Sequence, residues 1–432
     1  MSYIWDVKND VLIPKKYISI TLFVVVLLCE IYLPSYKVNF ALQFLVLGSL
    51  LLTSNIAISK RIINNLFPLI LIFGIGLFGF INSKHNLGFI IKDITYFLKP
   101  VNAILLSYLI FKKIKDVSLF LRVILFIGCL TAFIHLFGIF ILGDFANDSI
   151  NNIRGDFGLD NFIEVFAFYF LLFSKKYFGK SLIENRILQI FVLGVLLASI
   201  YLYFSRTMLV IMFLIGFSML GYAKITKKTL VFIGFSFAFI SLLYIYLFSV
   251  KLDRNSKGVE AFLYKIKIAP EEIFKTKIDR ENHKELWDHW RGYEANRAFE
   301  LMKENPSSYI IGAGYGSLVN LKFKAPLGNE DMKYISRLHN GYVFVFYKTG
   351  IFGLILILIF LIRLYLNIYR FNANNLNQLF VNRLISSIGI FYLFTTLIIS
   401  GIYIPRDAII FILGGLLSFD TYRKSTDKIT EQ

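Results

Sequence analysis

Long apolar segments run through most of this chain of 432 residues. A helix needs about 20 mostly apolar residues to cross about 30 Å of hydrocarbon, and by that measure about twelve segments qualify. They cover residues 17–33, 39–58, 67–82, 96–111, 118–143, 161–174, 187–204, 207–222, 229–250, 341–366, 384–400 and 406–420. A soluble protein needs far more polar surface than a chain that is 57% hydrophobic provides. The sequence therefore predicts an all-α polytopic integral membrane protein with about 12 transmembrane helices.

Basic residues concentrate in alternate loops between these segments and near both termini. They include Lys15-Lys16, Lys60-Arg61, Lys112-Lys113, Lys175-Lys176, Lys227-Lys228 and Arg423-Lys424. Loops rich in lysine and arginine face the cytoplasm, so we expect both termini there and the long segment 251–340 on the extracytoplasmic side. The same topology accounts for the net charge of +18 without a nucleic-acid partner.

The positions of the spans divide the chain into three regions. Residues 1–250 carry transmembrane helices 1–9, residues 251–340 form a large extracytoplasmic loop, and residues 341–432 carry helices 10–12 and a cytoplasmic tail. Apolar residues within 284–304 recur near helical spacing, which predicts an amphipathic helix or helix pair ending at Asn305-Pro306. The glycine-rich remainder, 307–338, is expected to be irregular. The first apolar segment lacks a small-residue cleavage site, so we expect it to stay as an anchor.

Basic residues on the extracytoplasmic side are candidates for binding an anion. They are Arg154, Arg206, Arg291, Arg297 and Lys99, the last about one turn inside the outer end of the fourth span. Arginine suits phosphate because its guanidinium group donates two parallel hydrogen bonds. Each arginine taken alone could instead reach out to lipid phosphates. Taken together, these residues favour an anionic pocket at the outer leaflet.

His339 is the best candidate for acid–base chemistry, because an imidazole can accept a proton near neutral pH. It lies where segment 251–340 returns to the membrane, and the side chain of the following Asn340 could orient it. The alternative is an interfacial histidine that only hydrogen-bonds to the backbone. Arg206 and Arg291 favour the catalytic interpretation, since a site requires several roles to be clustered.

Two other patterns carry less chemistry. His283 and His289 are six residues apart, whereas a helical metal pair needs a spacing of three or four, so no metal site is expected. The run Gly312-Ala313-Gly314-Tyr315-Gly316 lacks the strand before it and the Lys-Ser/Thr after it that a nucleotide loop requires. Its glycines are expected to permit a tight turn beside the ligand.

Several of these motifs, in this order, resemble the O-antigen polymerase and O-antigen ligase superfamily. The matching pieces are Ser205-Arg206-Thr207, Arg291 before a helix ending in Asn305-Pro306, Gly312-Ala313-Gly314, His339-Asn340-Gly341-Tyr342, Gly350-Ile351-Phe352-Gly353 and, more weakly, Arg154 to Asn161. The family's tryptophan after the loop arginine is replaced here by Trp287 and Trp290 before it. Leu338 stands where the ligase branch often has a paired histidine, which favours the polymerase branch.

The resemblance implies a GT-C-type glycosyltransferase of the bacterial cytoplasmic membrane. Its reaction would be a metal-independent, inverting transfer without a cofactor. Donor and acceptor would be repeat units on undecaprenyl diphosphate, joined into O-antigen or capsular polysaccharide at the outer face. Arg206 and Arg291 would stabilise the departing diphosphate, and His339 would take the acceptor proton.

The resemblance implies further roles, and rival functions remain open beside it. Substrate contacts would come from Arg154, Lys99, Arg297, Asn340 and Tyr342. A chain-length regulator and a flippase would be further partners besides the lipid bilayer. One alternative is an O-antigen ligase that transfers the glycan to lipid A–core. Another is a transporter or lipid flippase, which would need charged groups near the middle of the membrane.

Overall fold

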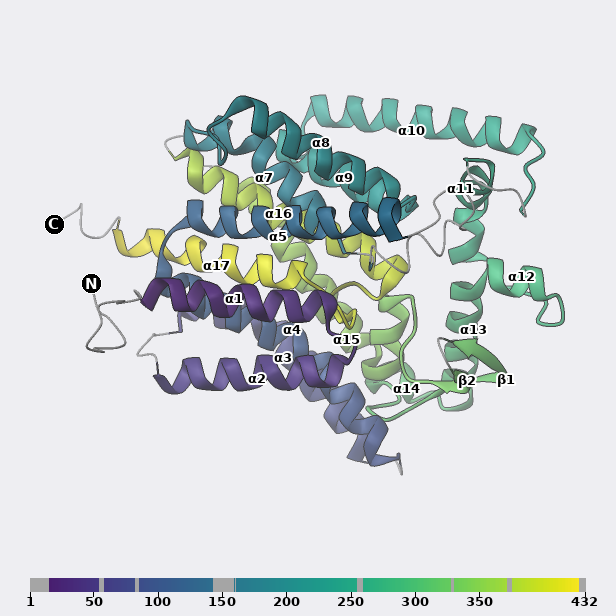
Figure 1. The fold of residues 1–432 in the computed structure, drawn as a ribbon. Coiled ribbons are helices and arrows are strands. Elements are labelled where there is room, and N and C mark those ends of the chain that lie inside the picture. Colours follow the sequence, from purple (N-terminus) through teal and green to yellow (C-terminus); the bar gives the residue numbers. More distant parts are fainter. Residues whose placement is uncertain are drawn as a thin grey trace.

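The computed structural model describes residues 15–53, 58–81, 85–142, 159, 161–254, 259–327, 330–370 and 375–426. Most of these residues are helical (Figure 1). The apolar helices are α1 (Lys15–Tyr32), α2 (Tyr36–Thr53), α3 (Lys60–Ile81), α4 (Leu87–Ile114), α5 (Val117–Phe137), α7 (Ile163–Phe178), α8 (Arg186–Leu202), α9 (Arg206–Leu220), α10 (Lys227–Ser249), α15 (Gly341–Tyr365), α16 (Leu376–Ile399) and α17 (Ile409–Thr426). Short helical turns follow three of them, at η1 (Gly138–Leu142), η3 (Leu366–Tyr369) and η4 (Gly401–Tyr403).

Every apolar segment expected from the sequence coincides with one of these helices. Within the described ranges, seven spans are long and apolar enough to cross a membrane: α2, α3, α4, α5 with η1, α10, α15 with η3, and α16. Shorter apolar helices are α8, α9 and the first part of α17. The chain is therefore an all-α polytopic membrane protein, as the sequence predicts.

Polar residues at the span boundaries explain why the helices begin where they do. A side chain before the first turn accepts a backbone hydrogen bond at Asn86, Asp116, Asn185, Ser205, Thr226, Asn340 and Asn375. Such caps satisfy N–H groups that have no partner inside the helix. Ser205 caps α9 directly after α8, so these two helices form the expected hairpin rather than one long helix.

Segment 251–340 packs against one end of the bundle (Figure 1). It contains α11 (Val259–Phe274), α12 (His283–Asp288), α13 (Trp290–Glu304), α14 (Ser308–Ile311), β1 (Val319–Leu327) and β2 (Glu330–Ile335). The first turn of α1 and the last turn of α17 lie at the opposite end of the bundle. The expected helix pair within 284–304 corresponds to α12 and α13.

The expectation that 307–338 is irregular is wrong, because β1 and β2 form an antiparallel hairpin in which Val319 pairs with Ile335. The two-residue period of β1 is the physical reason. Val319, Leu321 and Ala325 are buried, while the lysines between them are exposed. The glycines before the strand and a proline within it obscure that pattern in the sequence.

The glycine run 312–316 fastens this segment to the bundle. Ala313 N donates to Tyr347 O of α15 at 2.7 Å, and Tyr315 N donates to Gly76 O of α3 at 3.2 Å. The glycines at 312, 314 and 316 have positive φ, and a Cβ on Gly312 would lie 2.3 Å from Lys348 O. The run therefore serves close backbone packing between two helices. The expected turn is present at these glycines, and its position beside a ligand stays a prediction.

Aromatic side chains form the core beneath this junction. Phe97 of α4 lies 5.0 Å from Tyr315, 5.3 Å from Phe344 and 4.6 Å from Tyr403, measured between ring centroids. These residues come from α4, the glycine run, α15 and η4. The core therefore joins the membrane helices and segment 251–340 into one packed body at this end.

Two buried ion pairs lie at the same end of the bundle. Asp93 of α4 accepts hydrogen bonds from Lys348 Nζ at 2.5 Å, from Gly316 N at 2.8 Å, and from Ser336 Oγ. Glu30, near the end of α1, accepts from Lys99 Nζ at 2.5 Å and from Asp407 N at 2.6 Å. Each buried charge is thus paired and hydrogen-bonded, as its burial requires.

Candidate active site

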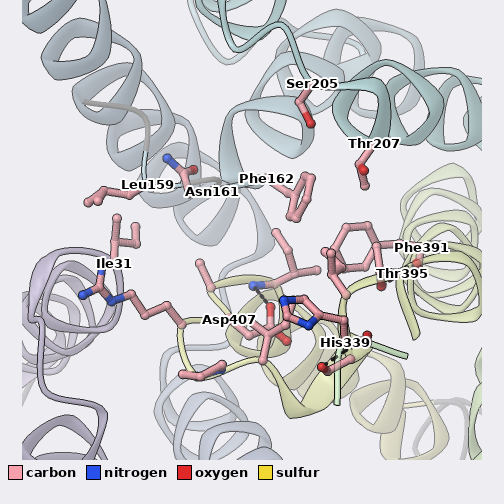
Figure 2. Close-up of a pocket in the computed structure, with 18 of the residues that line it drawn as sticks. Ile31, Leu159, Asn161, Phe162, Ser205, Thr207, His339, Phe391, Thr395 and Asp407 are labelled. Carbon is pink, nitrogen blue, oxygen red and sulfur yellow. Dashed lines mark hydrogen bonds between the residues drawn. The ribbon is translucent and has the colours of Figure 1, made fainter. Parts of the chain in front are cut away.

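A cavity of about 340 Å³ opens at the end of the bundle that carries segment 251–340. Its charged or ionisable lining side chains are Arg337, His339, Arg406 and Asp407. Ser205 and Thr207, at the start of α9, lie across the cavity from His339 and Asp407 (Figure 2). Apolar walls from Ile31, Phe162 and Phe391 complete a pocket that can take a charged headgroup with an apolar neighbour.

His339 is oriented by a carboxylate that the sequence interpretation missed. Its Nδ1 lies 2.9 Å from Glu294 Oε2, and its backbone N donates to the same oxygen at 2.9 Å. The Glu294 side chain is 2% exposed, whereas that of His339 is 44% exposed. A carboxylate accepts hydrogen bonds, so Nδ1 carries the proton and Nε2 is left as the acceptor. This is the arrangement that a general base with an orienting partner requires.

The backbone of His339 is held from the other side by the end of α16. Ser400 N donates to His339 O at 2.6 Å, and Ser400 Oγ donates to Leu338 O at 2.7 Å. The two backbones approach so closely that a Cβ on Gly341 would lie 2.8 Å from the Ser400 backbone. The helix start that follows His339 therefore requires glycine at position 341.

Arg206 and Arg291 converge on one carboxylate, Glu272 of α11. Arg206 Nη2 lies 2.9 Å from Glu272 Oε2, and Arg291 pairs with the other oxygen. Arg291 Nε also donates to Ile398 O at 2.9 Å. Arg291 and Glu294 are three residues apart on α13, so one helix face holds both this cluster and His339. The structure thus joins Arg206 and Arg291 through Glu272. Neither arginine is among the described residues that line the cavity of His339.

The other predicted substrate contacts have structural partners instead. Lys99 pairs with Glu30 and with Pro405 O. Arg297 donates to Asn320 O at 2.9 Å beneath the hairpin. Asn340 caps α15 by accepting from Val343 N, and Tyr342 donates to Leu393 O at 2.8 Å.

None of these four side chains is among the described residues that line the cavity. The interpretation that Asn340 orients His339 is corrected, because Glu294 does so. Lys99 lies in a buried ion pair because Glu30, 69 positions away in sequence, is its neighbour in space. Arg154 lies outside the described residues.

Arg337, Arg406 and Asp407 are cavity residues that the sequence interpretation did not select. Arg337 stands two positions before His339, and Arg406 lies in the loop between η4 and α17. In that loop, burial raises the pKa of Asp407 to about 7. The signal that could have found Glu294 is its position one helical turn after Arg291.

The comparisons with known proteins bear on the middle of the chain. Residues 191–358 match a family model described as O-antigen ligase. The matched segment contains Arg206, Glu272, Arg291, Glu294 and His339. No curated protein matches the chain.

Proposed function

We propose that this chain, whose residues 191–358 belong to the O-antigen ligase and polymerase superfamily, joins lipid-linked oligosaccharide repeat units into a polysaccharide. The observation that carries the proposal is the His339–Glu294 pair in a cavity whose cationic side chains are Arg337 and Arg406. A base beside guanidinium groups suits transfer of a sugar from a diphosphate to a hydroxyl.

In the proposed reaction, His339 Nε2 takes the proton of the acceptor hydroxyl, and that oxygen attacks the anomeric carbon of the donor sugar. The bond from this carbon to the diphosphate oxygen breaks, and the configuration inverts. The leaving polyprenyl diphosphate gains negative charge, which Arg206 and Arg291 stabilise more in the transition state than in the ground state. Arg337 and Arg406 hold the diphosphate as it enters. Arginines thus supply the positive charge, and no metal ion is needed.

The distribution of lysines supports an extracytoplasmic position for this cavity. The basic pairs Lys112-Lys113 and Lys175-Lys176 lie in the last turns of α4 and α7, while α10 starts at Lys227-Lys228. The helices alternate in direction, so these positions fall at the bundle end opposite segment 251–340. The positive-inside rule assigns that end to the cytoplasm.

The buried ion pairs favour an enzyme over a transporter. Glu30 lies in the last turn of α1, and Lys348 lies in the second turn of α15. Both pairs therefore lie near the end of the bundle that carries the cavity, although Lys99 is the thirteenth of the 28 residues of α4. A transport path would instead be expected to place charged groups near the middle of the membrane.

Arg291→Ala is expected to lower transfer by about 10²–10³-fold, the usual effect of removing a group that stabilises developing charge. Arg206→Lys is expected to fail similarly, because an ammonium group cannot form the bidentate contact. The measurement uses purified protein in vesicles supplied with lipid-linked repeat units, with gel separation of the products.

The matched control is Arg254→Lys, which alters an ion pair with Asp288 in the same segment but away from the cavity. It should keep normal activity. Full activity in Arg291→Ala would remove the arginine pair from the mechanism, and full activity in Arg206→Lys would remove Arg206 from the diphosphate role.

The Glu272 carboxylate forms ion pairs with both Arg206 and Arg291. The diphosphate must therefore displace this carboxylate in order to reach the arginines. Glu272→Gln is therefore expected to bind a polyprenyl diphosphate about tenfold more tightly, a change of roughly 1.4 kcal/mol. Binding of the unmodified lipid diphosphate to the purified variant measures this effect. Glu271→Gln, at a neighbouring position with a carboxylate 56% exposed, is the control. Weaker binding by Glu272→Gln would mean that Glu272 is needed to position the arginines.

A second candidate function is transfer of the finished glycan to a lipid A–core acceptor. The description of the matching family model, O-antigen ligase, favours it. Supplying the purified protein with both acceptors distinguishes the two. A ladder of lengthening lipid-linked products supports the polymerase, whereas a single transfer to lipid A–core supports the ligase.

A further inference from the structure

A second hollow lies in segment 251–340, apart from the His339 cavity. It has a volume of about 410 Å³ and lies between α12 and β1. Its lining includes Arg280, His283, Trp287, Lys322, Phe323 and Lys324. We propose that this α12–β1 groove binds acidic sugar units of the glycan that the enzyme elongates. The proposal rests on the proposed function for the source of its ligand.

Trp287 and Phe323 are the aromatic side chains that line the groove, and the buried rings of Trp290 and Tyr293 pack against them. Trp287 stacks on Trp290 with centroids 4.8 Å apart and planes inclined by 23°. Trp290 continues the stack to Tyr293 at 5.8 Å and meets Phe323 edge-on at 6.3 Å. Trp287 Nε1 also donates to His283 Nε2 at 2.8 Å, which fixes the ring. The C–H face of a pyranose packs on such rings, and a fixed ring loses little entropy when it binds.

The charge of the groove selects for an anion. Lys322 and Lys324 both line it and are exposed. Within the described part of the chain, neither ammonium group pairs with a carboxylate. The lining carboxylate of Glu281 forms an ion pair with Arg280, whose Nη2 lies 2.5 Å from Glu281 Oε1. The groove thus presents two available ammonium groups beside an aromatic face, a combination that fits a sugar carrying a carboxylate.

A β-bulge directs one of these lysines. The register of the hairpin shifts between Asn320 and Ala325. Within this interval Lys322 has φ of +66°, a left-handed conformation that is rare for a residue with a side chain. Lys322 N donates to Asn320 Oδ1 at 2.8 Å, which holds the strained residue. A bulge changes the direction in which a side chain points. Strained non-glycine residues are concentrated at binding and active sites, which supports a binding role for Lys322.

Helix α13 connects the groove to the proposed catalytic cavity. Its Glu294 holds His339, while its buried Trp290 and Tyr293 pack against Trp287 and Phe323 of the groove. Tyr293 also donates to Leu321 O of β1 at 2.6 Å, which ties the groove to the helix. Both sites are therefore tied to the same helix. The groove would hold units already added while the next transfer occurs.

The first test is a direct binding measurement on the full chain in detergent. The chain has three tryptophans, so a Trp5→Phe background leaves Trp287 and Trp290 to report on the groove. A galacturonic acid hexasaccharide should change the fluorescence saturably, and a neutral maltohexaose should bind about tenfold more weakly, since each exposed ion pair contributes up to about 1 kcal/mol. Added salt should reduce the difference.

The second test removes the charges. Lys322→Ala with Lys324→Ala should weaken acidic hexasaccharide binding about tenfold and leave maltohexaose binding unchanged. The matched control is Lys303→Ala with Lys333→Ala, two lysines outside the groove lining. Polymer made by the groove variant should be shorter than polymer made by the control variant. Binding is measured without catalysis, so a His339→Ala protein should bind as the unaltered protein does, even if the proposed reaction is wrong.

Several outcomes would overturn the groove assignment. Equal affinity for acidic and neutral hexasaccharides would remove the role of the lysines. Unchanged binding in the Lys322/Lys324 double variant would place the glycan elsewhere. The groove would instead be a lipid contact if no variant bound either saccharide and the Lys322/Lys324 double variant lost only its binding to vesicles rich in phosphatidylglycerol.

Discussion

A His339→Ala variant is expected to form no long-chain polysaccharide while its expression and membrane insertion persist. The alanine removes the Nε2 acceptor that would take the hydroxyl proton, and losing a general base usually costs about 10²–10⁴-fold in rate. The side chain is 44% exposed at the cavity, so its removal should disturb packing little. Product length on a gel and transfer rate in reconstituted vesicles measure the effect.

Glu294 provides the companion test, because it acts on the substrate only through His339. Glu294→Gln should slow transfer less than His339→Ala. In the double variant the Glu294 change should cost nothing further, since the residue that it positions is already gone. His85→Gln, which alters a histidine that contacts Ala313 O at 3.4 Å, is the control and should keep activity. Polymer of normal length from His339→Ala would end the proposal that His339 is the base.

The membrane helices were predictable because their signal is local. A run of about 20 apolar residues specifies a span without reference to any partner, and caps such as Ser205 and Asn340 mark where helices start. The same reasoning located the α8–α9 hairpin and the helix pair of segment 251–340. The β1–β2 hairpin was missed because a short strand next to glycines and a proline carries a weak pattern.

The site was predictable only in part, because its chemistry depends on contacts between distant residues. The sequence selected His339, Arg206 and Arg291 by residue type and by position along the expected topology. It could not select Glu272, which lies 66 positions from Arg206, or Glu294, which lies 45 positions from His339. A carboxylate on an amphipathic helix ordinarily faces solvent, so nothing local distinguishes Glu272, and for Glu294 the local signal is only its position one helical turn after Arg291.

The Asp93–Lys348 pair shows how a buried ion pair outside the cavity helps to fix the position of His339. Both side chains are completely buried and lie 2.5 Å apart. Asp93 also accepts from Ser336 Oγ, three residues before His339, and from Gly316 N. A single carboxylate of α4 therefore fixes α15, the glycine run and the end of the hairpin at once. Removing this carboxylate should therefore shift the segment from Ser336 to His339 and, with it, the position of the His339 side chain.

Lys348→Met is expected to lower the free energy of unfolding by about 3–5 kcal/mol, because it leaves the Asp93 carboxylate buried without its counter-charge. Adding Asp93→Leu removes that charge and should recover part of the loss. A deficit of about 1–3 kcal/mol should persist for each buried donor, Gly316 N or Ser336 Oγ, that stays without a partner. Thermal unfolding of detergent-purified variants, followed by size-exclusion chromatography, measures the order of stabilities.

The control for this series is Lys16→Met, which breaks the exposed pair with Asp116, where the two side chains are 43% and 37% exposed. Exposed pairs contribute at most about 1 kcal/mol, so its stability should hardly change. The double variant should regain stability without regaining normal transfer, since Ser336 would still lack the acceptor that holds the chain before His339. Stability of Lys348→Met equal to that of the Lys16→Met control would contradict the assignment. Normal transfer by the double variant would show that Asp93 does not position His339.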